Sequence, residues 1–411
     1  MNVLHVVKSL NPITGGPAIS VPSLCRELSY LDCNISLLTK SLGGYYELED
    51  YGNSKLIKKR FTISDLISMF HGVLPDLSNI MRGMDIVHLH EIWPIENAII
   101  ANYAKQNGIK LIISPHASLL PGDLNKTLIK QVKKWLAWNI YLKHSFRSID
   151  GINVTASNEL SSVRAIGFKT NAALISNGIN IKEFEELPGR EVFKKYFPDL
   201  YEKKILLFFS RIEPKKGLSL LAHAWGKLAE KFPEWHLLIV GPNENNHWDY
   251  IKTILCSYGL KKKYTYAGFL HGEAKYAVLS AAQLFILPTY WENFGIVVAE
   301  AMMAKTPVIT TTETPWEKIV PEGCGWIIKP DHEELVAIMD HALSLHENIL
   351  DDMGNRGHVF IKKGYNWKDV ALKMREFYSF ILFGGVIPDF VYSLKGNKRV
   401  RLPFAKPIKL L

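Results

Sequence analysis

The sequence predicts an α/β protein built from two doubly wound, Rossmann-like domains. Its 411 residues are more than one compact hydrophobic core usually holds. Short runs rich in Val, Ile and Leu alternate with helical patterns along the chain, which is typical of parallel sheets covered on both faces. The alternation pauses over residues 176–204, where charged and turn residues replace the strand pattern. We therefore expect one sheet on each side of a boundary near residues 185–195.

The apolar runs give the expected strands. In the first half they are residues 2–7, 34–39, 86–90, 110–115 and 151–156. In the second half they are residues 205–210, 236–241, 264–268, 284–288 and 307–311. Between them lie amphipathic segments such as residues 218–232, whose apolar side chains recur at helical spacing. In such folds ligands bind beyond the carboxyl ends of the strands, in a cleft that we expect between the two domains.

Composition indicates a folded protein with a basic surface. The chain has 49 Lys and Arg against 40 Asp and Glu, a net charge of +9, which favours phosphates, nucleic acid or an acidic lipid surface as partners. Its four cysteines form no close pair, so they signal neither a disulfide framework nor a zinc site and fit the reduced cytosol. The first residues run directly into a strand pattern without a leader, and no apolar run is long enough to span a bilayer. These features predict a cytoplasmic protein.

Two segments carry groups suited to phosphate. Gly15 and Gly16 follow the first expected strand and precede a helix, so their backbone could approach an anion, although a plain strand-to-helix turn is the commoner explanation for such a pair. Neither the G-x-G-x-x-G pattern nor a P-loop is present. In the second half, Arg211 ends a strand and Lys216 precedes Gly217 and a helix. A guanidinium and an ammonium there could neutralise a diphosphate, and surface cations in a loop are the alternative.

The segment PTYWENFGIVVAEAMMAKTPVIT, residues 288–310, places Glu292 and Glu300 around an apolar stretch. If a helix begins near Phe294-Gly295, Glu292 lies in the loop before it and Glu300 lies inside it. Eight helical residues rise roughly 12 Å, comparable with the span from a hexose to a ribose across a diphosphate. Carboxylates accept hydrogen bonds from vicinal hydroxyls, and the helix N-terminus between them favours phosphate. Solvated helix charges are the plainer explanation.

The segments SRIEPKKG, PTYWENFGIVVAEAMMAKTPVI and SNGI resemble the retaining glycosyltransferases of family four, which have the GT-B fold. The resemblance extends from GGP near the N-terminus to NWKDVALKMREFYSFIL, where it implies a helix that crosses back to the first domain. The implied domains are residues 1–190, on the acceptor side, residues 191–370, which bind the nucleotide sugar, and residues 371–411, the crossing helix and a basic tail. No cofactor beyond the donor substrate is implied.

The resemblance also implies roles for individual residues. Glu292 would hold hydroxyls of the donor sugar and Glu300 those of the ribose, while Arg211 and Lys216 bind the diphosphate and Gly15-Gly16 approach it from the first domain. His116, in SPHAS, would lie near the reacting sugar carbon. The donor-binding set then comprises Gly15, Gly16, Arg211, Lys216, Glu292, Asn293, Phe294, Gly295, Ile296 and Glu300. The chain departs from the family at Ala117, where many members have Gly, and at TTTETPWEKI, which replaces a glycine-rich turn.

Several histidines raise the alternative of a metal site. His88 and His90 lie on one face of an expected strand, and Glu91 and His116 could lie nearby. No further ligand spacing supports this cluster, and the chain contains no Asp-x-Asp of the kind that holds a donor's metal ion in the other main transferase fold. We therefore predict no metal ligands.

The predicted function is transfer of a hexosyl unit from a nucleoside-diphosphate sugar to an acceptor hydroxyl with retention of configuration. A nucleotide-sugar epimerase on the same frame and a non-catalytic sugar-nucleotide-binding protein are the alternatives, because fold alone does not fix function. We expect a glycan or polyprenyl-linked acceptor, as in bacterial surface polysaccharide assembly, and no nucleic-acid partner. The sequence carries no code for the nucleobase, the sugar or the linkage.

A basic stretch predicts contact with the inner face of the cytoplasmic membrane. Residues 124–147 place Lys126, Lys130 and Lys133-Lys134 at helical spacing beside a stripe of Trp135, Trp138 and Leu142. The tail adds six basic residues: Lys395, Lys398, Arg399, Arg401, Lys406 and Lys409. Each basic residue near an anionic surface contributes on the order of 1 kcal/mol. The alternative is that the apolar stripe packs on the sheet and that the basic tail is only solvated, without membrane contact.

Overall fold

The computed structural model divides the chain into two compact units. Unit 1 comprises residues 1–178 and 367–411, and unit 2 comprises residues 179–366. The structure describes the chain except for residues 12–13, 41–51, 59–74, 121–123, 125–127, 147–148, 245 and 394–411. The chain thus passes between the units at Gly178/Ile179, twelve residues before the boundary expected after residue 190, and at Asn366/Trp367, four residues before the boundary expected after residue 370.

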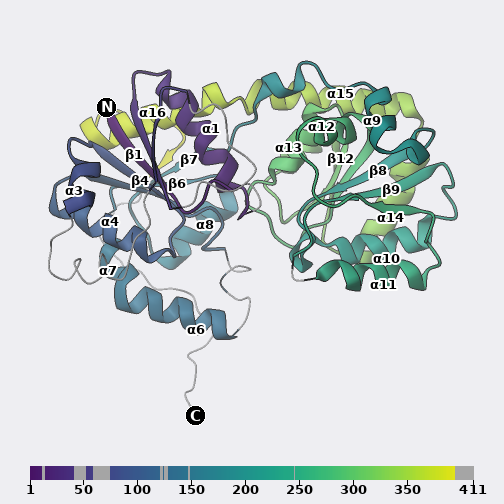
Figure 1. Cartoon of the computed structure of the whole chain (residues 1–411), viewed down its shortest axis with the longest axis horizontal. Coiled ribbons are helices and arrows are strands. Elements are labelled where there is room, and N and C mark those ends of the chain that lie inside the picture. The colour runs from purple at the N-terminus through teal and green to yellow at the C-terminus, as the bar shows by residue number, and fades with distance from the viewer. Residues whose placement is uncertain are drawn as a thin grey trace, which may run out of the picture. The chain divides into compact units, whose positions relative to one another are not determined.

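Unit 1 is built on an eight-stranded sheet with the order β14-β7-β6-β5-β4-β1-β2-β3 (Figure 1). Only β14 runs antiparallel to its neighbour among the described strands. The strands are β1 (Asn2–Val7), β2 (Asn34–Thr39), β3 (Lys55–Lys58), β4 (Ile86–His90), β5 (Lys110–Ser114), β6 (Gly151–Val154), β7 (Asn171–Leu174) and β14 (Val391–Tyr392). Because order reverses between β1 and β4, their carboxyl ends form the switch point where ligands bind in doubly wound sheets.

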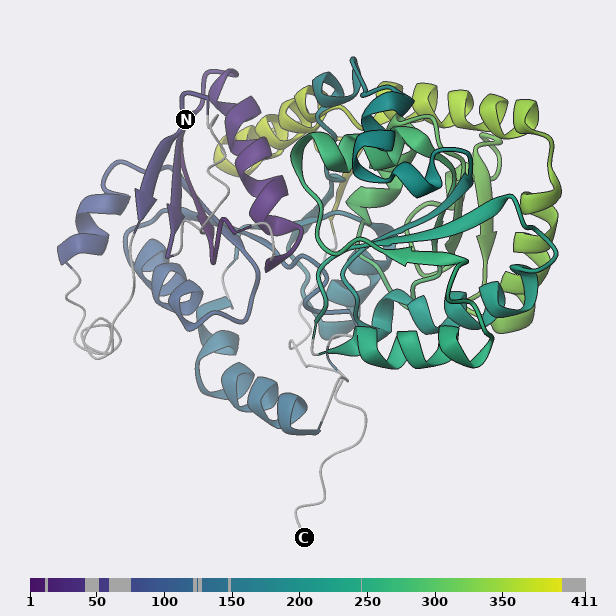
Figure 2. The same cartoon turned by 45° about the vertical axis from the view of Figure 1, so that its right-hand side comes forward.

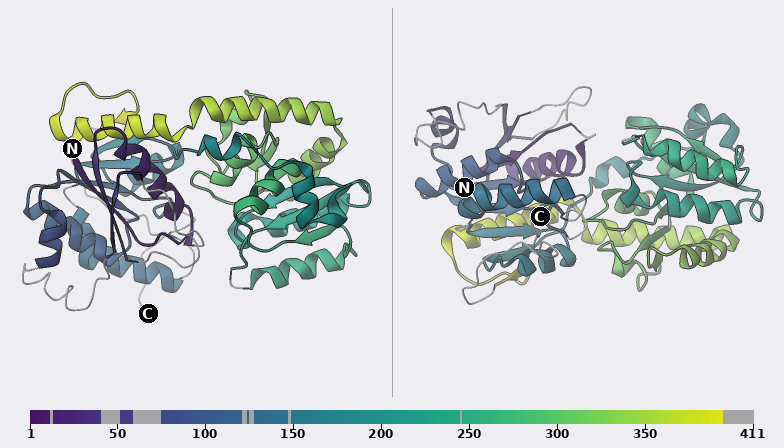
Figure 3. Two further views of the ribbon diagram at one scale, coloured as in Figure 1. Left: turned by 45° about the horizontal axis from the view of Figure 1, so that its top comes forward. Right: turned by 90° about the horizontal axis from the view of Figure 1, so that it is seen from below.

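Helices cover both faces of this sheet. On one face α1 (Pro17–Ser29) and α16 (Trp367–Phe383) lie side by side and share a core that includes Leu24, Val370 and Phe377 (Figures 1 and 3). The other face is covered by α3 (Pro75–Met81), α4 (Ile95–Gln106), α6 (Leu128–Ala137), the π-helical turn η2 (Trp138–Leu142), α7 (Lys143–Ser145) and α8 (Ser157–Ile166). The helix expected at the C-terminal crossing is therefore present as α16.

Unit 2 has a six-stranded parallel sheet with the order β10-β9-β8-β11-β12-β13. Its strands are β8 (Lys204–Phe209), β9 (Trp235–Val240), β10 (Tyr264–Tyr266), β11 (Ala282–Leu287), β12 (Val308–Thr311) and β13 (Gly325–Ile328). Chain order reverses between the neighbours β8 and β11, so the switch point of this unit lies at their carboxyl ends.

The sheet of unit 2 lies between two helical layers (Figure 2). One layer contains α10 (Leu218–Leu228), α11 (His247–Ser257) and α14 (His332–Ser344), and the other contains α9 (Arg190–Tyr196), α12 (Gly272–Ala281), α13 (Ile296–Met303) and α15 (Glu347–Gly364). Short 3-10 turns connect these elements: η4 (Ile181–Phe184), η5 (Pro198–Leu200), η6 (Pro214–Lys216) and η7 (Glu317–Ile319). The predicted fold class, two doubly wound parallel sheets, is confirmed.

Candidate active site

The switch point of unit 2 gathers the charged residues that the sequence singled out there. Arg211 follows β8, Lys216 ends η6, and Glu292 lies in the loop between β11 and α13. Gly217 lets the first loop approach β11, because a Cβ at this position would lie 1.9 Å from the carbonyl oxygen of Pro288. Its φ of +71° is also one that L residues rarely adopt. The two loops are therefore held together by backbone geometry.

Lys216 and Glu292 form a nearly buried ion pair. Their side chains are 8% and 14% exposed, and Nζ of Lys216 donates a hydrogen bond to Oε2 of Glu292. Burial alone would raise the pKa of Glu292, but the charges of Lys216 and Lys215 outweigh burial and lower this pKa. Glu292 is thus held as a carboxylate, with its Oε1 accepting the Asn293 N–H at 3.0 Å.

Arg211 lies between two carboxylates. Its guanidinium is 2.7 Å from Glu213 and 2.7 Å from Glu244, and Lys215 is 3.4 Å from the same Glu213. Burial would lower the pKa of Arg211, but the carboxylates raise it. The cations Arg211, Lys215 and Lys216 consequently form one cluster at the carboxyl end of β8, which suits a diphosphate.

Helix α13 begins where the sequence predicted, with Gly295 at its N-cap and Ile296 as its first residue. Glu292 therefore precedes the helix and Glu300 lies about one turn inside it, where its carboxylate is 2.8 Å from Nζ of Lys275 on α12. Sequence reasoning missed Lys275, because nothing in the pattern of α12 marks it. Gly295 has a φ of +72°, so glycine is the residue that fits this N-cap.

The segment TTTETPWEKI braces the Glu292 loop. The Glu292 N–H donates to the carbonyl of Glu313 at 2.9 Å. Trp316 is 1% exposed, its indole N–H donates to the carbonyl of Phe294 at 2.5 Å, and the two rings lie 5.0 Å apart. Where the family resemblance implied a glycine-rich turn, this chain has a tryptophan anchor that fixes Phe294.

Asn293 carries an unsatisfied acceptor. Its side-chain Oδ1 is buried and has no hydrogen-bond partner among the described residues. A buried carboxamide oxygen without a donor costs free energy, so such an atom next to Glu292 points to a ligand that supplies one. A sugar hydroxyl is a donor of this kind.

In unit 1, Gly15 and Gly16 lead into α1. Gly15 has a φ of +123°, and a Cβ there would meet nothing within 4 Å. Gly16 is the N-cap residue of α1 and no side chain caps this end of the helix. Pro17, the first residue of α1, has no N–H, and the N–H groups of Ala18 and Ile19 donate to the carbonyls of Gly15 and Gly16. The left-handed φ of residue 15 favours glycine, and the approach of an anion to this turn stays a prediction.

His116 follows β5 in a strained turn. Both His116 and Ala117 have positive φ, +51° and +65°. The turn is held by Glu159, a fully buried residue whose carboxylate accepts the N–H of Ala117 at 2.6 Å and that of Thr155 at 2.8 Å. Burial raises the pKa of Glu159 although these hydrogen bonds oppose the rise. The positive φ at Ala117 explains why many family members have Gly there.

Ala117→Gly should stabilise the protein. A left-handed residue other than Gly stores about 1 kcal/mol or more, and Gly removes this strain at some entropic cost in the unfolded chain. We expect the free energy of unfolding to rise by about 0.5 to 1 kcal/mol in urea titrations. Ala337→Gly, at an exposed position within α14, is the control and should lower it by about 1 kcal/mol. Equal losses in both variants would contradict the assigned strain.

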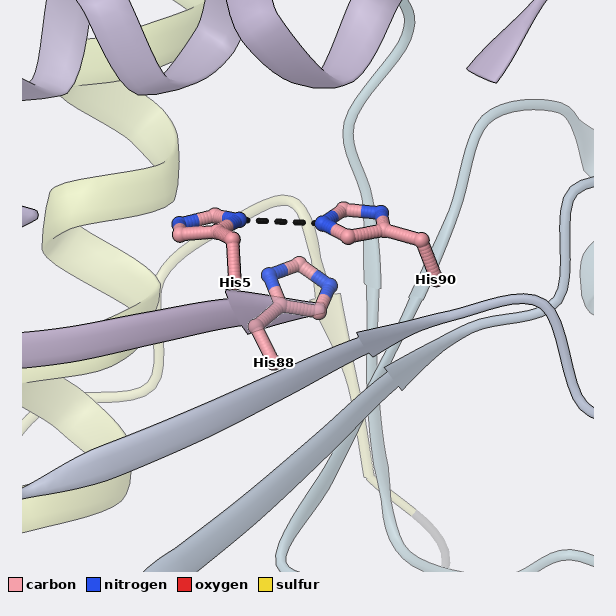
Figure 4. A group of neighbouring side chains, drawn as sticks. All are labelled: His5, His88 and His90. Atoms are coloured by element: carbon pink, nitrogen blue, oxygen red, sulfur yellow. Dashed lines mark hydrogen bonds between the residues drawn. The ribbon is translucent and has the colours of Figure 1, made fainter. Parts of the chain in front are cut away.

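A row of buried histidines runs back from His116. His116 Nε2 lies 2.9 Å from His90 Nδ1, and His90 Nε2 lies 2.9 Å from His5 Nδ1. His88 pairs opposite His5 in the sheet register, and Figure 4 shows the three rings of His5, His88 and His90 from β1 and β4 together. Burial lowers the pKa of His5 to about 3 and that of His116 to about 4, and holds those of His88 and His90 well below the usual range. All four rings are therefore neutral at physiological pH.

The geometry of these histidines bears on the alternative of a metal site. In the described part of the chain, the ligand atoms close enough to share one ion belong to His5, His88 and His90, and the set includes neither Glu91 nor His116. Both nitrogens of each of these three rings already lie within hydrogen-bond distance of a neighbouring side chain. The rings of His5 and His90 are stacked at 14°, as are those of His88 and His90 at 27°. The arrangement is that of a hydrogen-bonded chain, and the prediction of no metal ligands stays a prediction.

A small pocket adjoins His116 within unit 1. It is lined by polar residues of several elements, including Ser20, His90, Ser114, Asn153 and Ser176. The hydroxyl of Ser20 and the Oδ1 of Asn153 are buried in it without hydrogen-bond partners among the described residues. Within the described part of unit 1, no Lys, Arg, Asp or Glu lines this pocket, in contrast to the charged site of unit 2.

Comparison with known proteins divides the chain into two parts close to the two units of the structure. A family model described as Glycosyltransferase Family 4 matches residues 14–183, and one described as Glycosyl transferases group 1 matches residues 191–367. The chain is 23% identical over 383 residues to a GDP-mannose:cellobiosyl-diphosphopolyprenol alpha-mannosyltransferase of Xanthomonas oryzae pv. oryzae, covering 90% of this chain and 94% of that protein.

Solved structures share the fold. Anabaena Alr3699/HepE in complex with UDP-glucose matches with a TM-score of 0.74 at 16% identity, covering 92% of this chain and 99% of that one. WaaG, a glycosyltransferase involved in lipopolysaccharide biosynthesis, matches with a TM-score of 0.70 at 16% identity, covering 93% and 100%. With one family model on each unit and glycosyltransferase neighbours across the whole chain, the protein belongs to the family 4 glycosyltransferases of group 1 and has their GT-B fold.

Proposed function

We propose that this glycosyltransferase moves a hexosyl unit from a nucleoside-diphosphate sugar to an acceptor hydroxyl with retention of configuration. The observation that carries the proposal is the cluster at the β8/β11 switch point of unit 2. There, three cations and two carboxylates lie beside a helix N-terminus: Arg211, Lys215, Lys216, Glu292 and Glu300 with α13. Each group has a counterpart on a sugar nucleotide.

The cations and α13 suit the leaving group. The N–H groups at Gly295 and Ile296 lie at the positive end of the helix, and Arg211 and Lys216 add full charges. In the transition state, charge grows on the departing diphosphate, so fixed cations stabilise it more than the ground state. These side chains fill the role that a divalent cation has in other transferases, and we propose that the reaction needs neither a metal nor a cofactor.

The carboxylates and Asn293 suit the sugars. Glu292 and the unpartnered Asn293 Oδ1 would accept hydroxyls of the transferred hexose, with Phe294 held in place behind them. Glu300, a turn into the helix, would accept the ribose hydroxyls. The roles that the family resemblance implies for His116 and Gly15-Gly16 of unit 1 stay predictions.

The reaction requires no covalent nucleophile on the protein. The bond between the anomeric carbon and the diphosphate oxygen breaks, and the acceptor oxygen bonds to that carbon on the same face. The acceptor's proton passes to the departing diphosphate oxygen. The protein contributes orientation and charge stabilisation, each of which reaches several kcal/mol in enzymes.

The relatives suggest donors and acceptors to test first. The Xanthomonas protein is named for GDP-mannose and a polyprenol-linked acceptor, and the Anabaena structure holds UDP-glucose. Purified protein would be screened with GDP-, UDP- and ADP-sugars by thermal shift, and the stabilising donors incubated with polyprenyl-diphosphate-linked glycans. We expect acceptor-dependent release of nucleoside diphosphate that persists in excess EDTA. Conversion of the donor without an acceptor would instead indicate an epimerase. Donor binding without turnover would indicate a binding protein, and loss of activity in EDTA would indicate a metal requirement.

Substitution of Glu300 should affect donor binding, and substitution of Glu292 should affect turnover. Glu300→Gln should raise the donor Kd about tenfold, since a hydrogen bond to a charged group contributes about 1.5 kcal/mol or more. Glu292→Gln should chiefly lower kcat, because its partner is the transferred sugar. Titration calorimetry with nucleoside diphosphate and steady-state kinetics separate the two effects. Glu347→Gln, in the exposed first turn of α15, is the control. Two silent glutamate variants would refute the assignment.

We further propose that unit 1 binds an anionic membrane surface through α6 and η2, where a lipid-linked acceptor would be presented. The expected stripe was wrong in part: Trp138 and Leu142 are 3% and 0% exposed and pack in the core. The exposed apolar residues are Ile129, Trp135, Leu136 and Ile140, beside the exposed Lys130 and Lys133. Such a mixture suits a membrane interface. Lys126 and the basic tail lie outside the described residues, and no helix in the described part could cross a bilayer.

Flotation with liposomes tests this surface. The protein should float with anionic vesicles at low salt and be released at high salt. Ile129→Glu/Ile140→Glu should reduce the bound fraction several-fold, because each change removes exposed apolar area and adds repulsion. Val359→Glu, at an equally exposed position on α15, should have little effect. Absence of flotation at low salt would favour a free cytoplasmic enzyme with a soluble acceptor.

A further inference from the structure

The buried histidines of unit 1 continue into a hydrogen-bonded chain that ends at Asn153. His5 Nε2 lies 3.3 Å from the Tyr378 hydroxyl, which lies 2.6 Å from His88 Nδ1. His88 Nε2 lies 2.7 Å from Ser114 Oγ, and Asn153 Nδ2 donates to the same Ser114 oxygen at 3.2 Å. With the links from His5 through His90 to His116, seven side chains are connected. They come from β1, β4, β5, β6, α16 and the turn that follows β5.

A chain of this kind has one proton direction throughout. A neutral imidazole has one N–H and one acceptor nitrogen, so each ring that accepts on one side must donate on the other. Tyr378 and Ser114 likewise accept from one neighbour and donate to the next. The direction is therefore set at the ends, and every histidine between them takes the tautomer that this direction requires.

Asn153 fixes the direction at the buried end. Its NH₂ group donates to Ser114, so the Ser114 hydroxyl donates to His88 Nε2, and His88 Nδ1–H donates to Tyr378. Tyr378 then donates to His5 Nε2, His5 Nδ1–H to His90 Nε2, and His90 Nδ1–H to His116 Nε2. Running the chain the other way would need Asn153 to turn over, leaving its NH₂ without the partner it has now, or Ser114 to accept from both Asn153 and His88, leaving the Ser114 hydroxyl hydrogen without an acceptor among the hydrogen bonds described. An unpaired N–H costs more than an under-used carbonyl, and only Oδ1 of Asn153 is unpaired as it stands.

From this geometry we infer that the chain holds His116 as the Nδ1–H tautomer, so that His116 presents a hydrogen-bond donor and not a proton acceptor to substrate. His116 Nε2 is occupied by His90, which leaves Nδ1 as the nitrogen that can meet a ligand. An Nδ1–H donates to a sugar hydroxyl or ring oxygen and cannot take the acceptor's proton. The part that concerns substrate rests on the proposed function, and the tautomer does not.

The assignment gives His90, His5, Tyr378, His88, Ser114 and Asn153 the role of positioning residues. None of them needs to touch substrate. The low exposure of His5 and His88, at 0%, and of His90, at 2%, limits competition from water at these three rings. Because Tyr378 lies on α16, the tautomer of His116 depends on the packing of α16 against the sheet of unit 1.

The test is a long-range ¹H–¹⁵N spectrum of the full chain labelled at histidine, which reports the protonated nitrogen of each neutral ring. We expect Nδ1–H at His5, His88, His90 and His116 at pH 7.5, although Nε2–H is the usual form in water. Signals are assigned by their loss in single His→Gln variants. Nε2–H at His116 would overturn the proposal whether or not the protein transfers sugar.

Asn153→Asp should reverse the chain. A carboxylate accepts the Ser114 proton, so His116 should change to Nε2–H, and kcat should fall about tenfold or more with a smaller change in KM. Tyr378→Phe interrupts the chain and should give mixed tautomers at His5, His90 and His116, while Tyr141→Phe, which touches none of these residues, should leave spectrum and kcat unchanged. Unaltered tautomers in Asn153→Asp would contradict the proton direction. A reversed tautomer with unchanged kcat would contradict the donor role of His116.

Discussion

Lys216→Met should lower kcat by about 10²- to 10³-fold, the usual effect of removing one fixed group that stabilises transition-state charge. It should also destabilise the protein by about 3 to 5 kcal/mol, because Glu292 is left as an unpaired charge at a nearly buried position. The two losses have different origins. The first comes from the missing ammonium at the diphosphate, and the second from the partner left behind.

A double variant separates these origins. Lys216→Met/Glu292→Gln removes both charges, so most of the lost free energy of unfolding should return while kcat stays low. Urea denaturation and steady-state kinetics of the two single variants and the double variant form a complete cycle. Lys318→Met, at an exposed position on η7, is the control for removing a surface lysine. Recovery of kcat together with stability in the double variant would show that Lys216 serves the fold alone.

Mild acid should destabilise unit 1 steeply. His5, His88 and His90 are neutral when folded, with a pKa of about 3 at His5 and values well below the usual range at the other two. When unfolded they titrate near 6.5, so between these values the unfolded chain binds more protons than the folded one. Stability is therefore fully present above about pH 6.5 and is lost as the pH falls. Three such groups give a slope of about 4 kcal/mol per pH unit near pH 5.

Other buried groups of unit 1 modify this slope without reversing it. His116, with a pKa of about 4, adds to the loss. Glu159 opposes it, because a raised folded pKa makes the folded state bind a proton first as the pH falls. Calorimetric unfolding at pH 5.5 in buffers of different ionisation enthalpy should show about one proton taken up for each of these buried histidines. The total should therefore be about one proton smaller in His5→Asn. Unfolding without proton uptake would mean that the histidines are already charged in the fold.

The sequence predicted elements where periodicity and burial coincide. All ten expected strands are present. Nine of them contain buried Val, Ile, Leu or Phe side chains, and the tenth, β10, is a partly buried Tyr-Thr-Tyr segment. The missed strands lack this signal for different reasons. β3 is largely exposed, β7 is an Asn-Ala-Ala-Leu segment, β13 has four residues and β14 has two. Their pairing depends on neighbouring strands more than on their own side chains.

Some residues of the candidate site could be placed from the sequence and others could not. Arg211, Lys216, Glu292 and Glu300 could be placed from the sequence because strand ends and helix starts fix loop positions in a doubly wound sheet. Lys275, Trp316 and Glu159 could not be placed, because each reaches the site from an element distant in sequence: Lys275 contacts Glu300, Trp316 contacts Phe294, and Glu159 contacts Ala117. The histidine chain was invisible for the same reason, since His5, His88 and Tyr378 meet only through the register of β1 and β4 and the packing of α16.

The stereochemistry of the first-formed product tests the central claim most directly. The measurement is a ¹H NMR time course of the protein with an α-linked nucleotide sugar, beginning with GDP-mannose, and a polyprenyl-diphosphate-linked acceptor. Retaining transfer predicts an α-linked glycosyl product that appears in step with one equivalent of released nucleoside diphosphate, in the presence of EDTA. A β-linked product, or consumption of donor without a new glycosidic bond, would contradict the account.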